Sequence, residues 1–295
     1  MKNVKAKTNE QIAMQVSANS IAVNLMLSIF KLIAGLMASS GAMISDAIHS
    51  ASDVFSTIIV IIGVKISGKA SDEDHPYGHD RFECVASIIL AILLGVTGVG
   101  IGLTGVQKLT AGHYDTLAVP GVLALAAAVI SIVVKEIMYW YTRNAAKKIN
   151  SGALMADAWH HRSDALSSVG SFVGILGARM GFPMLDPLAS VVICLFVVKA
   201  AVDIFRDAIS KMTDKSCDQE TVNEMHDCIM SIQGVEGIDL LKTRSFGSKY
   251  YVDIEIKADG DKKLWEAHAI AENVHHVIEQ QFPLVKHCMV HVNPA

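Results

Sequence analysis

The sequence predicts a membrane protein in two parts, an all-α bundle of six transmembrane helices followed by a small cytoplasmic α+β domain. Of the 295 residues, 52% are hydrophobic and 18% are charged, and the mean hydropathy is +0.39. Soluble domains carry about 25% charged residues, so this composition favours the bilayer. The apolar excess lies in residues 1–207, whereas residues 208–295 have the composition of a soluble domain. We therefore place the domain boundary between these two ranges.

Six apolar runs in the first part are long enough to cross a bilayer. A spanning helix needs about 20 mostly apolar residues, and it satisfies its own backbone hydrogen bonds because lipid offers no partners. The predicted helices lie near residues 16–38, 42–66, 83–107, 118–141, 153–179 and 184–206.

The placement of lysine and arginine predicts the orientation of these helices, because basic residues collect on the cytoplasmic side. Basic residues occur at the N-terminus, after the sixth run and in alternate loops, one of which holds Lys65, Lys69 and Arg81. The intervening loops hold little more than Lys108 and Arg179. We therefore expect a multi-pass protein of the cell (inner) membrane with both termini in the cytoplasm.

The second part switches between helical and strand periodicity. Residues 219–231 and 263–281 have helical spacing, whereas apolar and polar residues alternate over 250–257 as in a half-buried strand. Further short strands are predicted near 236–244 and 285–292. The resulting order α-β-β-α-β is typical of a small open sheet with helices on one face.

Charge and cysteine content exclude two classes of protein. The formal net charge is -4 and the pI is near 6.3. This balance gives no basic stripe of the kind that nucleic acid requires, so nucleic acid is not an expected partner. The five cysteines are scattered without a CxxC pair, which indicates small core residues in a reducing compartment rather than a disulfide framework.

A polar motif occurs twice within the apolar runs. The second and fifth runs both contain the pattern D-A-x-H-x-x-S-D. Within it, His49 and Asp53 are four residues apart, and so are His160 and Asp164. Residues four apart lie on one face of a helix, one turn from each other. Each helix therefore presents an imidazole and a carboxylate on the same side.

Ionisable groups at this depth indicate a function. Each costs roughly 2.5–3.5 kcal/mol near the middle of a membrane, so four cost on the order of 10 kcal/mol. If the two helices pack face to face, two imidazoles and two carboxylates converge, which is a ligand set that suits tetrahedral Zn²⁺. Manganese and magnesium prefer more oxygen ligands, whereas cobalt, iron and cadmium remain compatible. The alternative is that these groups only form hydrogen bonds between helices.

The other polar residues of the two motifs are expected to have structural roles. Asp46 and Asp157 lie one turn further along each helix, and a four-coordinate ion needs no further ligand. His161 and Arg162 point away from the shared face and are expected to serve helix packing or the membrane interface.

Further motifs accompany the two HxxxD pairs: Asn24-Leu25 and Phe30-Lys31-Leu32 in the first run, and His75-Pro76-Tyr77-Gly78-His79 in the loop after the second. Together they make the chain similar, from about Asn19 to the C-terminus, to the cation diffusion facilitator family. The resemblance implies a homodimeric antiporter that exports a divalent metal from the cytoplasm in exchange for protons, and the version of the site with two histidines is associated with zinc. It also implies a ferredoxin-like cytoplasmic domain for regulation and dimerisation. The transport site that it implies is His49, Asp53, His160 and Asp164.

The chemistry of histidine agrees with such an exchange. An unperturbed imidazole titrates near pH 6.5, and metal binding requires its deprotonated form. The same ligands can therefore carry metal in one direction and protons in the other.

The resemblance implies a second, cytoplasm-facing metal site in the loop, formed by Asp72, His75 and His79. Pro76 and Gly78 exclude a regular helix there, so a turn must gather the ligands. The alternative is a solvated polar loop whose histidines cap the third helix.

The resemblance also implies a metal-sensing site in the second part of the chain. His268 and His291 match ligand positions of the family, whereas Asp239, Glu255 and Asn293 stand where histidine or aspartate is common. The two carboxylates are able to bind metal through oxygen, but Asn293 is a poorer ligand. The tail-site ligands are thus predicted to be Asp239, Glu255, His268 and His291.

Three alternative functions remain at this point. The same carrier with Fe²⁺, Co²⁺, Cd²⁺ or Mn²⁺ as its main cargo is the first. An intramembrane metal-dependent hydrolase is the second, although such sites keep an open coordination position and the sequence has no HExxH. A membrane-anchored metal sensor is the third, but it requires a rich ligand cluster in residues 208–295. We therefore predict a transporter and not an enzyme.

Overall fold

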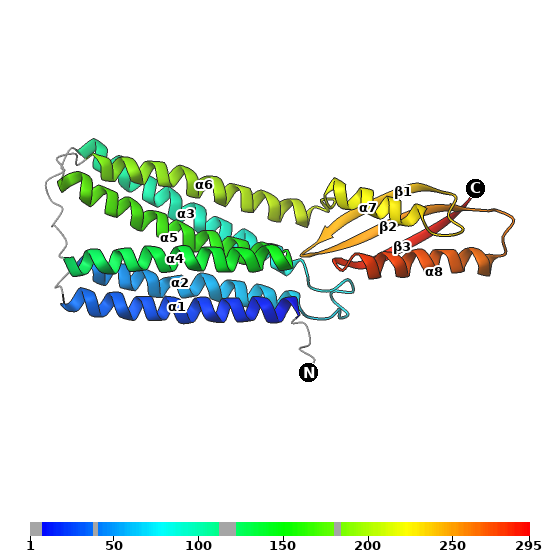
Figure 1. Ribbon diagram of the computed structural model, residues 1–295, viewed down its shortest axis with the longest axis horizontal. Coiled ribbons are helices and arrows are strands. Elements are labelled where there is room, and N and C mark those ends of the chain that lie inside the picture. Colours follow the sequence, from blue (N-terminus) through cyan, green and yellow to red (C-terminus); the bar gives the residue numbers. More distant parts are fainter. Residues whose placement is uncertain (1–7, 38–40, 112–121, 180–183) are drawn as a thin grey trace. The chain divides into compact units, whose positions relative to one another are not determined.

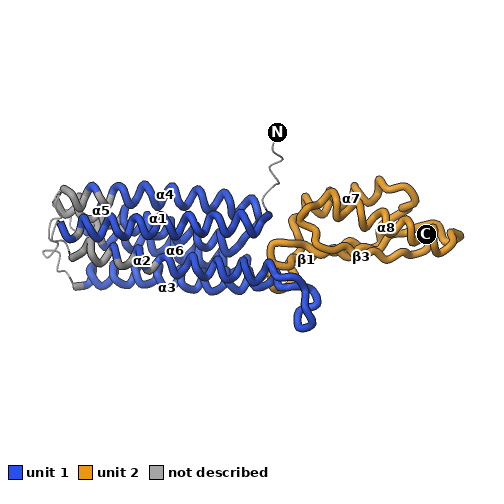
Figure 2. The backbone as a smooth tube through the Cα atoms, turned by 90° about the horizontal axis from the view of Figure 1, so that it is seen from below, with its two compact units in different colours: residues 1–208 blue, residues 209–295 orange. Residues whose placement is uncertain are grey.

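The computed structural model describes residues 8–37, 41–111, 122–179 and 184–295 (Figure 1). The chain divides into two compact units, Met1–Ala208 and Ile209–Ala295 (Figure 2). Each unit has its own hydrophobic core.

The described part of the first unit is built from six long helices, which coincide with the six predicted runs. α1 begins before its predicted start and α6 ends beyond its predicted end, while residue 38 and residues 118–121 of two runs lie outside the described residues. The helices are α1 (Asn9–Met37), α2 (Gly41–Ser67), α3 (Phe82–Ala111), α4 (Val122–Ile149), α5 (Gly152–Arg179) and α6 (Leu185–Met212).

Within the described residues, two segments, Asn9–Ala34 and Phe82–Thr110, have the length and the apolar composition of a membrane span. Helices α2 and α5 are of similar length but contain the ionisable residues of the candidate site, and α4 contains Lys135 and Glu136. The membrane crossing of all six helices therefore stays a prediction.

Large apolar side chains cover the outside of the first unit, while several ionisable groups lie inside it. Phe55, Val96 and Leu195 are 70%, 67% and 67% exposed. In contrast, Lys31 and Lys135 are both 2% exposed. Soluble proteins almost never bury such charges unless they are paired. The arrangement is the one expected of a bundle surrounded by hydrocarbon, in which ionisable residues face the interior.

Glycines of α3 allow α6 to approach closely. A Cβ added at Gly102 would lie 2.5 Å from the Sγ of Cys194, and one added at Gly105 would lie 2.9 Å from the carbonyl oxygen of Pro187. Small residues at such contacts are typical of helix packing in membranes, where close backbone approach replaces the hydrophobic driving force.

The second unit has the predicted order of elements, so the α-β-β-α-β prediction is confirmed. Strands β1 and β2 are antiparallel, β2 and β3 are parallel, and α8 provides the crossover that a parallel pair requires. The elements are α7 (Gln219–Met230), β1 (Gly237–Phe246), β2 (Lys249–Ala258), α8 (Leu264–Gln281) and β3 (Val285–Pro294).

The core of this unit follows from the predicted periodicities. On β2, Val252, Ile254 and Ile256 are buried, while Asp253, Glu255 and Lys257 between and after them are half-buried. On α8, Val274 and Ile278 lie one turn apart and are fully buried against the sheet. Burial of this apolar face holds the two helices and the sheet together.

Candidate metal centre

A tight hairpin between α4 and α5 aligns the two helices that carry most of the candidate site. Only Asn150 and Ser151 separate them, and Asn150 adopts a positive φ of 54°, which asparagine tolerates better than most residues. The Oγ of Ser151 accepts a hydrogen bond from the N–H of Leu154 at 3.2 Å and so caps the first turn of α5. In such an antiparallel hairpin, Lys135 and Asp164 lie at nearly the same level.

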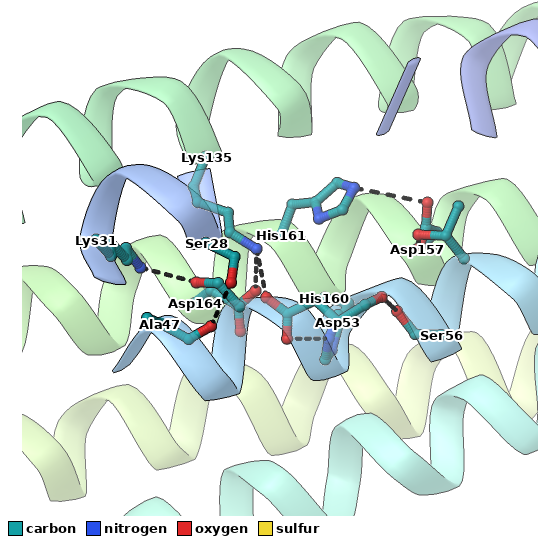
Figure 3. Close-up of polar contacts among 12 residues, drawn as sticks. Ser28, Lys31, Ala47, Asp53, Ser56, Lys135, Asp157, His160, His161 and Asp164 are labelled. Atoms are coloured by element: carbon teal, nitrogen blue, oxygen red, sulfur yellow. Dashed lines mark hydrogen bonds and ion pairs between the residues drawn. The ribbon is translucent and has the colours of Figure 1, made fainter. Parts of the chain in front are cut away.

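The bundle brings together three of the four predicted transport ligands (Figure 3). Asp53 comes from α2, and His160 and Asp164 come from α5; one ligand atom of each lies within 4.8 Å of the others. The Nε2 of His160 is 3.4 Å from the Oδ1 of Asp53. Both carboxylates are buried. Since metal ligands in a tetrahedral zinc site are about 2.0–2.2 Å from the ion, this spacing suits a single bound cation.

The fourth predicted ligand is not described to the same extent. His49 lies in α2, four residues before Asp53, but its side chain is outside the described part of the structure, as is that of Asp46. The role of His49 as a ligand therefore stays a prediction.

A lysine that the sequence analysis did not identify lies at the centre of this cluster. The Nζ of Lys135, on α4, donates to the Oδ2 of Asp53 at 2.6 Å and to the Oδ2 of Asp164 at 2.8 Å (Figure 3). Its side chain is only 2% exposed. The sequence contained a signal for it, because a lysine inside a predicted membrane helix is a candidate functional residue.

The same side chains line a small cavity. Its volume is about 40 Å³, which is room enough for water molecules. A second buried lysine, Lys31 of α1, donates to the Oγ of Ser50 at 2.8 Å on its wall. The cavity is lined by Lys31, Ser50, Asp53, Ser131, Lys135, Asp164, Ser167 and Ser168.

A second buried polar group, formed by Thr57, Asp157 and His161, also links α2 and α5. The Oγ1 of Thr57 on α2 donates to the Oδ1 of Asp157 on α5 at 3.1 Å. The Nε2 of His161 is 3.6 Å from the Oδ2 of Asp157, and both side chains are fully buried. Asp157 thus has the helix-linking contact expected of a structural residue. Arg162 packs its guanidinium 4.4 Å from the ring centre of Tyr139, so it contributes to α4–α5 packing.

The loop between α2 and α3 gathers Asp72, His75 and His79, with one ligand atom of each within 4.8 Å of the others. The two oxygens of Asp72 lie 3.4 Å from His75 Nδ1 and 3.3 Å from His79 Nε2. The Nδ1 of His79 is 3.1 Å from the carbonyl oxygen of Ala70. Because a carbonyl only accepts, this Nδ1 carries a proton, and Nε2 is the ring atom that faces Asp72 and would bind a metal.

The backbone of the loop fixes this arrangement. The N–H of His75 donates to the Oδ1 of Asp72 at 2.7 Å, and this hydrogen bond lowers the pKa of the Asp72 carboxyl. The turn closes through Gly78, whose φ of 94° favours glycine and whose N–H donates to the carbonyl of His75. The carboxylate is therefore held in its ionised, metal-binding form.

The four predicted tail ligands are not gathered into one group. The Nδ2 of Asn293 donates to Asp239 at 3.0 Å and to Glu255 at 3.4 Å. Hydrogen bonds from Lys257 and from Asn293 to Asp239 lower the pKa of its carboxyl. His291 is opposite Glu255 in the β2–β3 register. His268 lies on α8, where its Nε2 is 3.8 Å from Glu272. Among the described residues, no group of three potential ligands within 4.8 Å occurs in this unit, and the tail site stays a prediction.

Comparison with known proteins places this arrangement in a family. The family model for the cation efflux transmembrane domain matches residues 17–213, and the model for the cytoplasmic domain of cation efflux proteins matches residues 217–295. The manganese efflux system protein MneP of Bacillus subtilis is 33% identical over 98% of each chain. An uncharacterized transporter of Methanocaldococcus jannaschii is 36% identical over 93% of this chain and 95% of its own.

A plant relative is longer than this chain. Metal tolerance protein C1 of Arabidopsis thaliana is 33% identical over 91% of this chain, which spans 60% of that protein. The matches and the helical unit define the chain as a membrane-embedded transporter for metal cations and not an enzyme, which excludes the intramembrane hydrolase. The chain belongs to the cation diffusion facilitator family.

Proposed function

We propose that this chain exports a divalent transition metal, with zinc as the main cargo, from the cytoplasm in exchange for protons. The convergence of Asp53, His160 and Asp164 is the observation that supports this proposal most directly. With His49 as the fourth ligand, the site would offer two nitrogens and two carboxylate oxygens from two helices. Such a set suits zinc, and its carboxylates neutralise the charge of the ion.

Manganese is the second candidate cargo. The relative MneP, which matches nearly the whole chain, is named as a manganese efflux system protein. Carboxylate oxygens suit Mn²⁺, but the imidazole of His160 favours zinc, and divalent iron, cobalt and cadmium accept the same ligands. Flux of each metal, measured alone and in competition with zinc, separates these possibilities.

Proton exchange follows from the chemistry of the ligands. Imidazole and carboxylate bind a metal only in their deprotonated forms, so binding releases protons that the emptied site takes up again. In this proposal, the six helices α1–α6 cross the bilayer, both termini are cytoplasmic and two copies form a homodimer. The loop site of Asp72, His75 and His79 binds metal on the cytoplasmic side, and the tail regulates transport and supports dimerisation.

The test is metal and proton flux in sealed proteoliposomes, followed with a metal-sensitive dye inside and a pH-sensitive dye outside. D53A and D164A should each abolish metal-dependent proton flux, since each removes a ligand from a site of few ligands. D203A, which removes an exposed aspartate of α6, is the matched control and should retain wild-type flux. Size-exclusion chromatography checks that all variants remain folded. Undiminished flux in D53A or D164A would remove that residue from the site.

A further inference from the structure

The oxygens that the proposed metal would bind are already bound by a cation of the protein itself. Lys135 Nζ lies 2.6 Å from Asp53 Oδ2 and 2.8 Å from Asp164 Oδ2. An ion that bridges these two oxygens would sit about 2.0–2.2 Å from each of them. It would then overlap with the ammonium group, so the ion and the ammonium cannot occupy this position together.

Charge balance gives the same result. The cavity is lined by two carboxylates, Asp53 and Asp164, and by two lysines, Lys31 and Lys135, whose formal charges cancel. Addition of a divalent cation would give this buried site a net charge of +2, and uncompensated buried charge is strongly unfavourable. The two carboxylates therefore cannot compensate both ammonium groups and a bound divalent cation at the same time. Lys135 is the one that contacts both carboxylates, whereas Lys31 donates to Ser50.

The structure also contains an acceptor to which Lys135 can withdraw. Ser131 lies one turn before Lys135 on α4 and lines the same cavity. Its hydroxyl oxygen is buried and has no hydrogen-bond partner within the part of the chain that the structure describes. Lysine reaches such alternatives easily, because its ammonium is a point charge on a flexible four-carbon chain.

We propose that Lys135 is a tethered competitor of the transported metal. Its ammonium binds Asp53 and Asp164 when the metal leaves, and it moves towards Ser131 when the metal binds. This inference rests on the proposed function. The competition lowers the affinity of the site for the metal, which favours release of the metal.

The test measures how zinc flux in proteoliposomes depends on zinc concentration. K135M removes the competing charge but keeps an unbranched side chain, so the zinc concentration for half-maximal flux should fall roughly tenfold or more. Maximal flux should fall as well, because release becomes slow. S131A should act in the opposite direction and raise the half-maximal concentration severalfold, since the ammonium loses its alternative acceptor. K147M, the same substitution at an exposed position of α4, should change neither value.

These outcomes separate the inference from the proposed function. If Lys135 has a purely structural role, K135M will bind zinc as tightly as the wild type or more weakly, and that result overturns the inference. The proposed function still stands in that case, provided that the wild type transports zinc and D164A does not. Absence of zinc flux in the wild type, or its persistence in D164A, instead overturns the proposed function and the inference with it. If K135M does not fold, K135Q and S131A give the same comparison. A half-maximal concentration that does not move in either folded variant contradicts the competition.

Discussion

The double substitution D53N/D164N removes both carboxylates that bind the Lys135 ammonium but keeps the size of each side chain and an oxygen that accepts a hydrogen bond. Lys135 is 2% exposed, and its Nζ forms ion pairs with these two carboxylates at 2.6 and 2.8 Å (Figure 3). The substitution therefore isolates the electrostatic part of the interaction. Removal of one side of a buried ion pair typically destabilises a protein by about 3–5 kcal/mol, because the remaining charge has no compensation.

We expect D53N/D164N to lower the free energy of unfolding by that amount. D53N alone should cost less, since Asp164 still compensates the ammonium. Addition of K135M to the double variant should recover most of the loss, because a buried charge network replaced by apolar or neutral groups is often nearly neutral. K147M provides the background for a lysine substitution at an exposed site. The measurement is loss of helical circular dichroism during titration of mixed micelles with SDS.

The comparison of the double and triple variants shows whether the uncompensated charge of Lys135 causes the loss of stability. A triple variant as unstable as D53N/D164N would mean that the lysine charge is not what destabilises the double variant. The three buried groups would then not form one charge-compensated unit, and the reasoning on Lys135 would be refuted.

Three further predictions concern packing, reactivity and capping. G102L should destabilise the first unit by about 1–3 kcal/mol, because the new side chain overpacks against Cys194. G100L should not destabilise it, because no atom lies within 4 Å of a Cβ added at Gly100. Equal effects of the two substitutions in SDS titrations would contradict the close α3–α6 contact. Burial raises the pKa of the Cys288 thiol to about 12. Since the thiolate is the reactive form, iodoacetamide at pH 8 should modify Cys288 only after unfolding. Rapid labelling of Cys288 in the native protein, detected by mass spectrometry, would disprove this. S151A should cost about 1 kcal/mol, because Leu154 loses its capping hydrogen bond, and S151T, which keeps the hydroxyl, should restore most of it.

The fold was largely predictable because its elements depend on local sequence patterns. Six apolar runs became six helices, and the change from helical to alternating periodicity located β2 within residues 249–258. The repeated motif also predicted which residues meet. Asp53 and Asp164 converge although they are far apart in the chain, because each was assigned to the polar face of an apolar helix, and such faces must pack against one another.

Lys135 was not predicted because it belongs to no repeat. Its partners are 82 and 29 residues away, so no spacing in the sequence relates it to them. The tail ligands were predicted from a resemblance to family positions, which carries no geometry. The resemblance grouped His268 with Asp239 and Glu255, whereas in the structure Asn293 joins the two carboxylates and the His268 imidazole lies 3.8 Å from Glu272. The tail site stays a prediction.

Competition by Lys135 has a consequence for the choice between zinc and manganese. A tethered ammonium that must be displaced lowers the affinity of every divalent cation by the same factor, so it does not change the ratio of two affinities. It does change which cations still occupy the site at a given concentration, because the weaker binder falls below half-occupancy first. For a site with imidazole ligands, affinity is lower for Mn²⁺ than for Zn²⁺. Lys135 would therefore restrict the carrier to tightly bound metals without contacting any metal itself.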